Sequence, residues 1–283
     1  MTETILITGA TGNVGAEVVR ALPDTVQGRL ALRDAHEGQS LADTPHQLVP
    51  FDFLDSQTFA PALRDVDRVF LVRPPQLADV AIFEAFIKVA RECGVQQIVF
   101  LSLQGIERVS FVPHAKIEQA IIASGIPYTF LRAGFFMQNL DTTHRQDITE
   151  HHDVFVPAGK SKTAFIDVRD IGAVAAHVLT NTGHTNRTYT LTGSELLDYH
   201  EVAYVMSEVL PFDVTYSNPN LLHFAWRFWR RGIPLGQVLV MCFLYTITRF
   251  GQAAEIHDDV EMLLGRAPIT MRQYIEDYQH NWR

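Results

Sequence analysis

Apolar residues in the first half of the chain follow two alternating patterns. Short apolar runs predict strands, and the stretches between them, with apolar side chains at i, i+3 and i+4, predict amphipathic helices. The predicted strands are 4–8, 29–32, 48–51, 68–72, 97–102 and 128–132, and the predicted helices are 13–22, 55–63, 78–93 and 115–124. Strands that alternate with helices in this way are typical of a doubly wound α/β domain with a parallel sheet.

The alternation ends after Arg132. Residues 154–179 predict a strand and then a helix whose Ala and Val face suits packing on a sheet, and 186–193 predict a further strand. The remainder reads as mainly helical, at 198–210, 221–232, 235–248 and 270–282, with a short strand at 213–216. We therefore expect a nucleotide-binding core at 1–132 and a smaller, mainly helical substrate-pocket lobe at 133–283, with 163–181 returning to the core.

Composition narrows the classes of partner. A chain of 283 residues that is 47% hydrophobic and 19% charged can bury a large core. The formal charge of -9 argues against nucleic acid as a partner and favours a small molecule. The first residues carry no secretory pattern, so a cytoplasmic protein is expected. A homodimer is left open.

Two further features bear on the environment of the chain. The most apolar stretch, 235–248, is shorter than the roughly 20 residues a spanning helix needs, so we expect a buried helix or pocket wall and no membrane span. Cys93 and Cys242 lack the spacing of a zinc or redox motif and are expected to be reduced core thiols. Residues 150–153, EHHD, are adjacent and cannot readily converge on one ion, so no metal site is predicted.

A glycine-rich turn joins the first strand to the first helix. The segment GATGNVG carries Gly9, Gly12 and Gly15, a spacing that lets the backbone approach a pyrophosphate at a helix N-terminus. Within a strand-turn-helix unit this predicts a bound dinucleotide and a Rossmann-like domain.

The second strand ends in Arg33, where an NAD-binding protein would carry Asp or Glu. A guanidinium pairs with a 2'-phosphate, so NADP(H) is favoured over NAD. The alternative is a solvated surface arginine, and Asp34 stands beside it. Asp52, after the third strand, is either an adenine-pocket contact or a turn former.

These features, in order, resemble the NmrA-like, atypical branch of the short-chain dehydrogenases, of the triphenylmethane reductase and quinone oxidoreductase type. The resemblance also includes VRPP (72–75), HAKIE (114–118), SGIPYTFLRAGFFMQN (124–139) and DVRDIGAVAAHVL (167–179). This resemblance implies that the chain is an oxidoreductase that binds a nucleotide cofactor. The cofactor contacts it implies, with the turn included, are Gly9, Thr11, Gly12, Asn13, Val14, Gly15, Arg33, Val72, Arg73, Pro74, Gly134 and Phe135. Arg73 stands where the family would carry a small or polar residue; it could contact a phosphate or point to water.

The usual Tyr-x-x-x-Lys pair of short-chain dehydrogenases is missing, because none of the eight tyrosines has a lysine four residues later. The resemblance places His114 where isoflavone-reductase-like relatives carry a catalytic lysine. A histidine there could protonate an oxyanion near neutral pH, and Glu118, one helical turn on, could orient it and favour its charged form. The alternative is a solvated residue at a helix start. Lys116 is expected on the surface.

Ser102 ends the fifth predicted strand. Its hydroxyl could form a hydrogen bond with the substrate or the nicotinamide ribose, or alternatively with the backbone. The catalytic candidates are therefore His114, Glu118 and Ser102. The cluster FAWRFWRRG (224–232) could suit nucleic acid or anionic lipid, but a helix with a buried aromatic face and a solvated arginine face is the favoured interpretation.

Two functions fit these observations. The first is an NADPH-dependent reductase that passes hydride to a conjugated acceptor such as a quinone, a dye or an enone in an apolar pocket. The second is a non-enzymatic, NADP(H)-sensing regulator, which the missing Tyr-Lys pair also fits. The candidate histidine and the apolar C-terminal segment favour the enzyme.

Overall fold

The computed structural model describes residues 3–34, 41 and 44–283. It divides into two compact units. The first consists of Met1–Ala133 and Val168–Leu191, and the second of Gly134–Asp167 and Thr192–Arg283. Each unit has its own hydrophobic core, so we describe each by itself.

The first unit is built on a seven-stranded sheet in which all strands run parallel, in the order β3-β2-β1-β4-β5-β6-β8. The strands are β1 (Thr4–Ile7), β2 (Gln27–Leu32), β3 (Gln47–Pro50), β4 (Arg68–Leu71), β5 (Gln97–Leu103), β6 (Tyr128–Ala133) and β8 (Arg187–Leu191). The central β5 is buried along nearly its whole length, as expected for a strand covered on both faces. The predicted doubly wound α/β class is confirmed.

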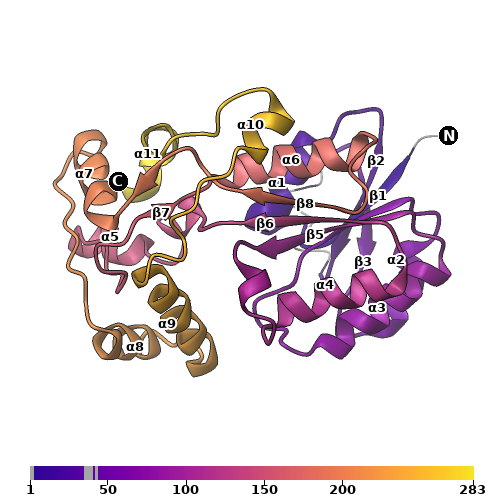
Figure 1. Cartoon of the computed structure of the whole chain (residues 1–283), viewed down its shortest axis with the longest axis horizontal. Helices are drawn as coiled ribbons and strands as arrows, with labels where there is room; N and C mark the ends of the chain where they lie inside the picture. The colour runs from indigo at the N-terminus through magenta and orange to yellow at the C-terminus, as the bar shows by residue number, and fades with distance from the viewer. Residues whose placement is uncertain (1–2, 35–40, 42–43) are drawn as a thin grey trace. The chain divides into compact units, whose positions relative to one another are not determined.

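Helices cover both faces of this sheet (Figure 1). They are α1 (Asn13–Ala21), α2 (Phe59–Leu63), α3 (Val80–Glu92), α4 (Pro113–Ser124) and α6 (Val168–Thr180), with the 3₁₀ helices η2 (Ser56–Thr58) and η3 (Ile106–Arg108). On one face, α2, α3 and α4 share a core rich in phenylalanine. On the other face α1 packs against α6, where Gly172 is needed because a Cβ atom there would lie 2.5 Å from Cβ of Glu17.

The second unit is mainly helical. Its elements are η4 (Met137–Asn139), α5 (Arg145–His151), α7 (Tyr199–Val209), α8 (Leu221–Arg230), α9 (Leu235–Arg249), α10 (Asp259–Leu264), α11 (Met271–Tyr278), η5 (Gln279–Trp282) and an antiparallel pair, β7 (Thr163–Ala164) with β9 (Leu196–Leu197). Its core is aromatic, with Phe155, Phe224, Phe228, Tyr274 and Trp282 fully or almost fully buried. The strand predicted at 213–216 is reduced to an isolated bridge between Asp153 and Thr215.

Two expectations about burial are wrong. Along α9, Val238 and Tyr245 are buried, but Leu239 and Phe243 are exposed, so the buried-helix alternative is wrong, while the pocket wall stays a prediction. Cys93 is exposed and therefore not a core thiol, because it follows directly after the last turn of α3. Among the described residues, no helix combines the length and the apolarity that crossing a membrane requires.

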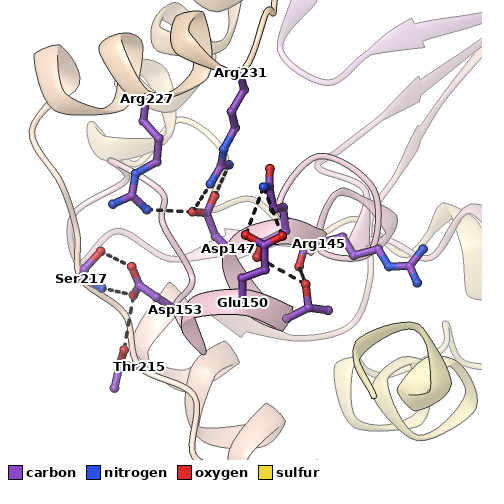
Figure 2. Close-up of polar contacts among 10 residues, drawn as sticks. Arg145, Asp147, Glu150, Asp153, Thr215, Ser217, Arg227 and Arg231 are labelled. Atoms are coloured by element: carbon purple, nitrogen blue, oxygen red, sulfur yellow. Dashed lines mark hydrogen bonds and ion pairs between the residues drawn. The ribbon is translucent and has the colours of Figure 1, made fainter.

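The orientation of α8 agrees with the prediction only in part. Phe224 and Phe228 are buried and Arg230 is exposed, as expected, but Trp226 and Trp229 are more than half exposed. Arg227 and Arg231, the residue that follows the helix, turn inward to Asp147 of α5 (Figure 2). The carboxylate of Asp147 is completely buried and accepts hydrogen bonds from Arg227 Nη1 at 2.7 Å and from Arg231 Nη1 and Nη2 at 2.6 and 2.7 Å. A buried carboxylate needs such partners, and satisfying it fixes which face of α8 turns inward.

The pKa of Asp147 shows the balance of these forces. Burial by itself would raise the pKa, but hydrogen bonds and charge from Arg231 and Arg227 together hold the pKa below its ordinary value. Asp147 therefore stays ionised at neutral pH and contributes stability that is lost as pH falls through its lowered pKa.

Replacing Asp147 with Asn should destabilise the second unit by about 3 kcal/mol, because two arginines lose their buried counter-charge. The chain has three tryptophans, Trp226, Trp229 and Trp282, all in this unit, so tryptophan fluorescence during urea unfolding measures the loss there. Glu150→Gln, an exposed change in the same helix, is the control and should leave the midpoint almost unchanged. Equal midpoints for both variants would contradict the assigned role of Asp147.

Candidate functional site

The glycine turn between β1 and α1 has a geometry that favours glycine at Gly9 and requires it at Gly15. Gly9 has a φ of +66°, and its carbonyl oxygen accepts a hydrogen bond from the Gly12 N–H at 2.9 Å. A Cβ atom at Gly15 would lie 2.0 Å from that same oxygen. The helix therefore starts directly against the turn.

This turn leaves donors available for an anion. Thr11, Gly12 and Asn13 are exposed, while Val14 and Gly15 lie beneath them and are buried. The N–H groups of the first helical turn have no acceptor within the helix, and the helix dipole adds partial positive charge. The predicted residues thus form a surface that fits a pyrophosphate.

Thr8 connects this turn to the end of the neighbouring strand β4. Its hydroxyl donates to the carbonyl oxygen of Phe70 at 3.0 Å and accepts from the Val72 N–H at 2.8 Å. A Cβ atom at Gly9 would lie 3.6 Å from Cβ of Val72, in ordinary contact. The segment that begins at Val72 is therefore fixed beside the turn.

Two more candidates follow β2 and β3. Arg33 comes directly after β2 and is exposed, as is Asp34. Asp52 accepts a hydrogen bond from the Leu54 N–H at 2.9 Å, which is a local turn contact and agrees with the turn-forming alternative.

The predicted pairing of Glu118 with His114 is not the one the structure shows. Glu118 accepts hydrogen bonds from Arg132 of β6, from Nε at 3.1 Å and from Nη2 at 2.7 Å, and a third from the Ser102 hydroxyl at 2.6 Å. Arg132 also pairs with Glu107 at 3.0 Å. Hydrogen bonding to Glu118 raises the pKa of Arg132, and a two-point guanidinium–carboxylate contact is stronger than one to an imidazole.

Ser102 and Glu118 thereby hold α4 onto the ends of β5 and β6. Their exposed fractions are 1% and 6%, so neither presents an open surface to a ligand. This geometry favours a positioning role for both residues.

His114 lies at the second position of α4, after Pro113, and its charged neighbour is Arg73. Arg73 Nε donates to His114 Nε2 over a long hydrogen bond of 3.5 Å. Because a guanidinium can only donate, Nε2 must be an unprotonated acceptor. Burial and, second, the charge of Arg73 lower the pKa of His114 to about 3, so the ring is neutral near pH 7.

The remaining candidates are distributed over both units. Pro74 gives its carbonyl oxygen to Arg73 Nη1 at 3.1 Å, and Lys116 is exposed. In the second unit Phe135 follows Gly134, and its carbonyl oxygen accepts from the Ile166 N–H at 2.9 Å. Its ring centroid lies 6.2 Å from that of Tyr245.

The described residues contain no group of three or more His, Cys, Asp or Glu side chains placed to hold a metal ion. Within EHHD, Asp153 accepts hydrogen bonds from the Ser217 N–H at 2.9 Å and hydroxyl at 2.6 Å (Figure 2). His152 stacks on Phe212.

Sequence reasoning missed two residues that shape this region, Thr8 and Arg132. Each had a signal in its position, since Thr8 is the last residue before the glycine turn and Arg132 ends a predicted strand. Polar residues at the carboxyl end of a parallel strand lie at the ligand-binding edge, which marks both for attention.

Comparison with known proteins adds family relationships. The profile of the NmrA-like family matches residues 1–242. The chain is 32% identical to the NAD(P)H azoreductase of Xenophilus azovorans over 275 residues, which cover 95% of this chain and 96% of that protein.

Solved structures extend the likeness to the whole fold. The NADPH-dependent quinone oxidoreductase of Escherichia coli, solved with NADPH, gives a TM-score of 0.86 at 25% identity, over 97% of this chain and 99% of that one. The triphenylmethane reductase of Citrobacter sp., solved with NADP(H), gives a TM-score of 0.84 at 24% identity, over 97% and 99%.

The pKa of His114 is directly testable by NMR. In the wild-type protein its ring signals should not titrate between pH 5 and 8, because the neutral form is favoured. Arg73→Gln should raise the pKa by removing the cation but leave it below 6.5, since burial is the larger cause. His114→Gln identifies the signals, and Arg91→Gln, an exposed change on α3, should alter nothing. A wild-type titration midpoint near 6.5 would refute the neutral assignment.

Proposed function

Because the chain belongs to the NmrA-like family, we propose that it is an NAD(P)H-dependent reductase that uses NADPH to reduce a conjugated small molecule such as a quinone, a dye or an enone. The observation that carries this proposal is the glycine turn. Its contact between Gly15 and the Gly9 carbonyl leaves backbone donors open at the start of α1, as a dinucleotide pyrophosphate requires.

In this proposal the first unit holds most of the cofactor. The turn from Gly9 to Gly15 binds the pyrophosphate, Arg33 binds the 2'-phosphate, and Val72 with Pro74 contacts the nicotinamide half. Asp52 remains a candidate for the adenine pocket, although its carboxylate already caps a local turn. Gly134 and Phe135, in the second unit, are further proposed contacts.

The bound cofactor supplies a hydride, and the protein must position the acceptor and accommodate the charge that forms on it. We assign Ser102 and Glu118 to positioning, since the Ser102 hydroxyl and Arg132 both donate hydrogen bonds to Glu118 and so fix α4 against β5 and β6. His114, neutral near pH 7 and already accepting from Arg73, is not available as an imidazolium donor. The proton that completes the reduction then comes from water.

The activity test is NADPH oxidation by the purified protein with quinones, triarylmethane dyes, azo dyes and enones. We expect turnover with at least one class of flat, conjugated acceptor. Tight NADPH binding without turnover on any of them would instead support the alternative, an NADP(H)-sensing regulator.

Arg33→Ala tests the cofactor preference. It should raise the Kd for NADPH by about tenfold or more, because a charge-assisted hydrogen bond to the 2'-phosphate is lost. The Kd for NADH should change little, which makes NADH the matched control ligand. Fluorescence titration of the reduced cofactor gives both constants. Equal losses for the two cofactors would show that Arg33 does not read the 2'-phosphate.

A further inference from the structure

We propose that the guanidinium of Arg73 stabilises the oxyanion that forms on a conjugated carbonyl acceptor when hydride arrives. The proposal rests on the reductase function proposed above and deepens it. It names the electrophilic group of the site and, with it, the class of acceptor: one whose reduction places negative charge on an oxygen.

Arg73 is a cation that has no counter-charge among the residues the structure describes. Within the part of the chain that the structure describes, no carboxylate lies within ion-pair distance of it, whereas Arg132 pairs with Glu107 and Glu118. Its Nη1 instead donates to the carbonyl oxygens of Pro74, Pro75 and Leu77, at 3.1, 3.3 and 2.6 Å. Neutral carbonyls hold the group in place but leave its charge uncancelled.

The position of Arg73 is that of a ligand contact. It lies two residues beyond β4, at the carboxyl edge of the sheet, where parallel α/β sheets bind ligands. The N–H group of the preceding residue, Val72, donates a hydrogen bond to the Thr8 hydroxyl beside the glycine turn. The side chain is partly buried, so its charge acts in a medium less polar than bulk water.

One edge of the guanidinium remains available. Nε and Nη2 lie on the same edge of the planar group, and Nε faces His114 Nε2. Among the described residues Nη2 has no hydrogen-bond acceptor, so its two N–H groups can donate to an oxygen placed next to His114. The opposite corner, Nη1, is the part that the loop carbonyls hold.

His114 suits this arrangement as a positioning residue. As a neutral acceptor it orients Arg73 without adding a second positive charge or neutralising the first. Burial and the adjacent cation lower the pKa of His114 to about 3, which keeps the ring in that form near neutral pH.

The step balances as follows. The hydride from the reduced nicotinamide forms a new C–H bond at the acceptor carbon conjugated to the carbonyl, and the π bond at that carbon breaks. Its electron pair moves through the conjugated system onto the carbonyl oxygen, which becomes the oxyanion next to Arg73 Nη2. The nicotinamide is oxidised, the acceptor is reduced, and water then protonates the anion.

The variants that test this are Arg73→Gln, which removes the charge, and Arg73→Lys, which keeps it. Arg91→Gln is the matched surface control. For each we would measure kcat and KM with the best acceptor, the Kd for NADPH, and the thermal unfolding midpoint. We would also measure the pKa of 4-nitrophenol, from its visible absorption, when bound to the protein loaded with NADP+.

We expect Arg73→Gln to lower kcat by about 10²-fold, the loss typical of removing one oxyanion donor, with little change in the Kd for NADPH. Arg73→Lys should recover part of kcat. Wild-type protein should lower the pKa of bound 4-nitrophenol by about one unit, since a cation favours the phenolate, and Arg73→Gln should abolish that shift.

Other outcomes separate the alternatives. Weaker NADPH binding with kcat retained would overturn the proposal and make Arg73 a cofactor contact. Turnover without any wild-type shift in the nitrophenol pKa would overturn it too. No turnover, with an Arg73-dependent shift, would refute the reductase function while the anion-binding role of Arg73 stands.

Discussion

In a parallel sheet the carboxyl ends of all strands lie at the same edge. The arrangement of the candidate site in the first unit depends on this constraint. The strands β1, β2, β4 and β5 end close to Gly9, Arg33, Arg73 and Ser102, so residues that are far apart in sequence lie along one line. Thr8 connects two of these strand ends. Its hydroxyl forms hydrogen bonds with the Phe70 carbonyl oxygen and the Val72 N–H, which fix the end of β4 relative to the glycine turn. The turn proposed to bind the pyrophosphate and the strand end that is followed by Arg73 are thereby held next to each other.

The treatment of charge separates structural from functional residues in this protein. Glu118 and Asp147 are buried carboxylates, and each has guanidinium partners that satisfy its oxygens. Such pairs fix the position of helices, because a buried charge without a partner is costly. Arg73 is partly buried, and its partners within residues 3–34, 41 and 44–283 are all neutral. Burying a cation without a counter-charge costs free energy. At the ligand-binding edge of the sheet, such a cation is better explained by a role in binding an anion than by a role in stabilising the fold.

Patterns along the chain predicted the parallel sheet, the apolar faces of its amphipathic helices and the glycine turn. Each of these depends on local periodicity or on backbone conformation. The same patterns could not predict partners that come from distant elements. The spacing of His114 and Glu118 put them correctly on one helix, but Arg132, from β6, takes the carboxylate. The composition of α8 suggested solvated arginines, which holds for Arg230, and only the presence of buried Asp147 on α5 shows why Arg227 and Arg231 turn inward.

His114 lies next to Arg73 and not next to a free carboxylate, and this difference sets how the charge of the site depends on pH. A histidine paired with a carboxylate would gain and lose a proton near neutral pH, and the charge of the site would follow the pH. With Glu118 engaged by Arg132, His114 faces Arg73 and stays neutral, while the arginine keeps its proton at any physiological pH. The charge that Arg73 places beside His114 is therefore constant and positive. In the proposed reduction, hydride transfer creates negative charge on the acceptor before a proton is added. The fixed cation of Arg73 would stabilise that charge, and water would supply the proton.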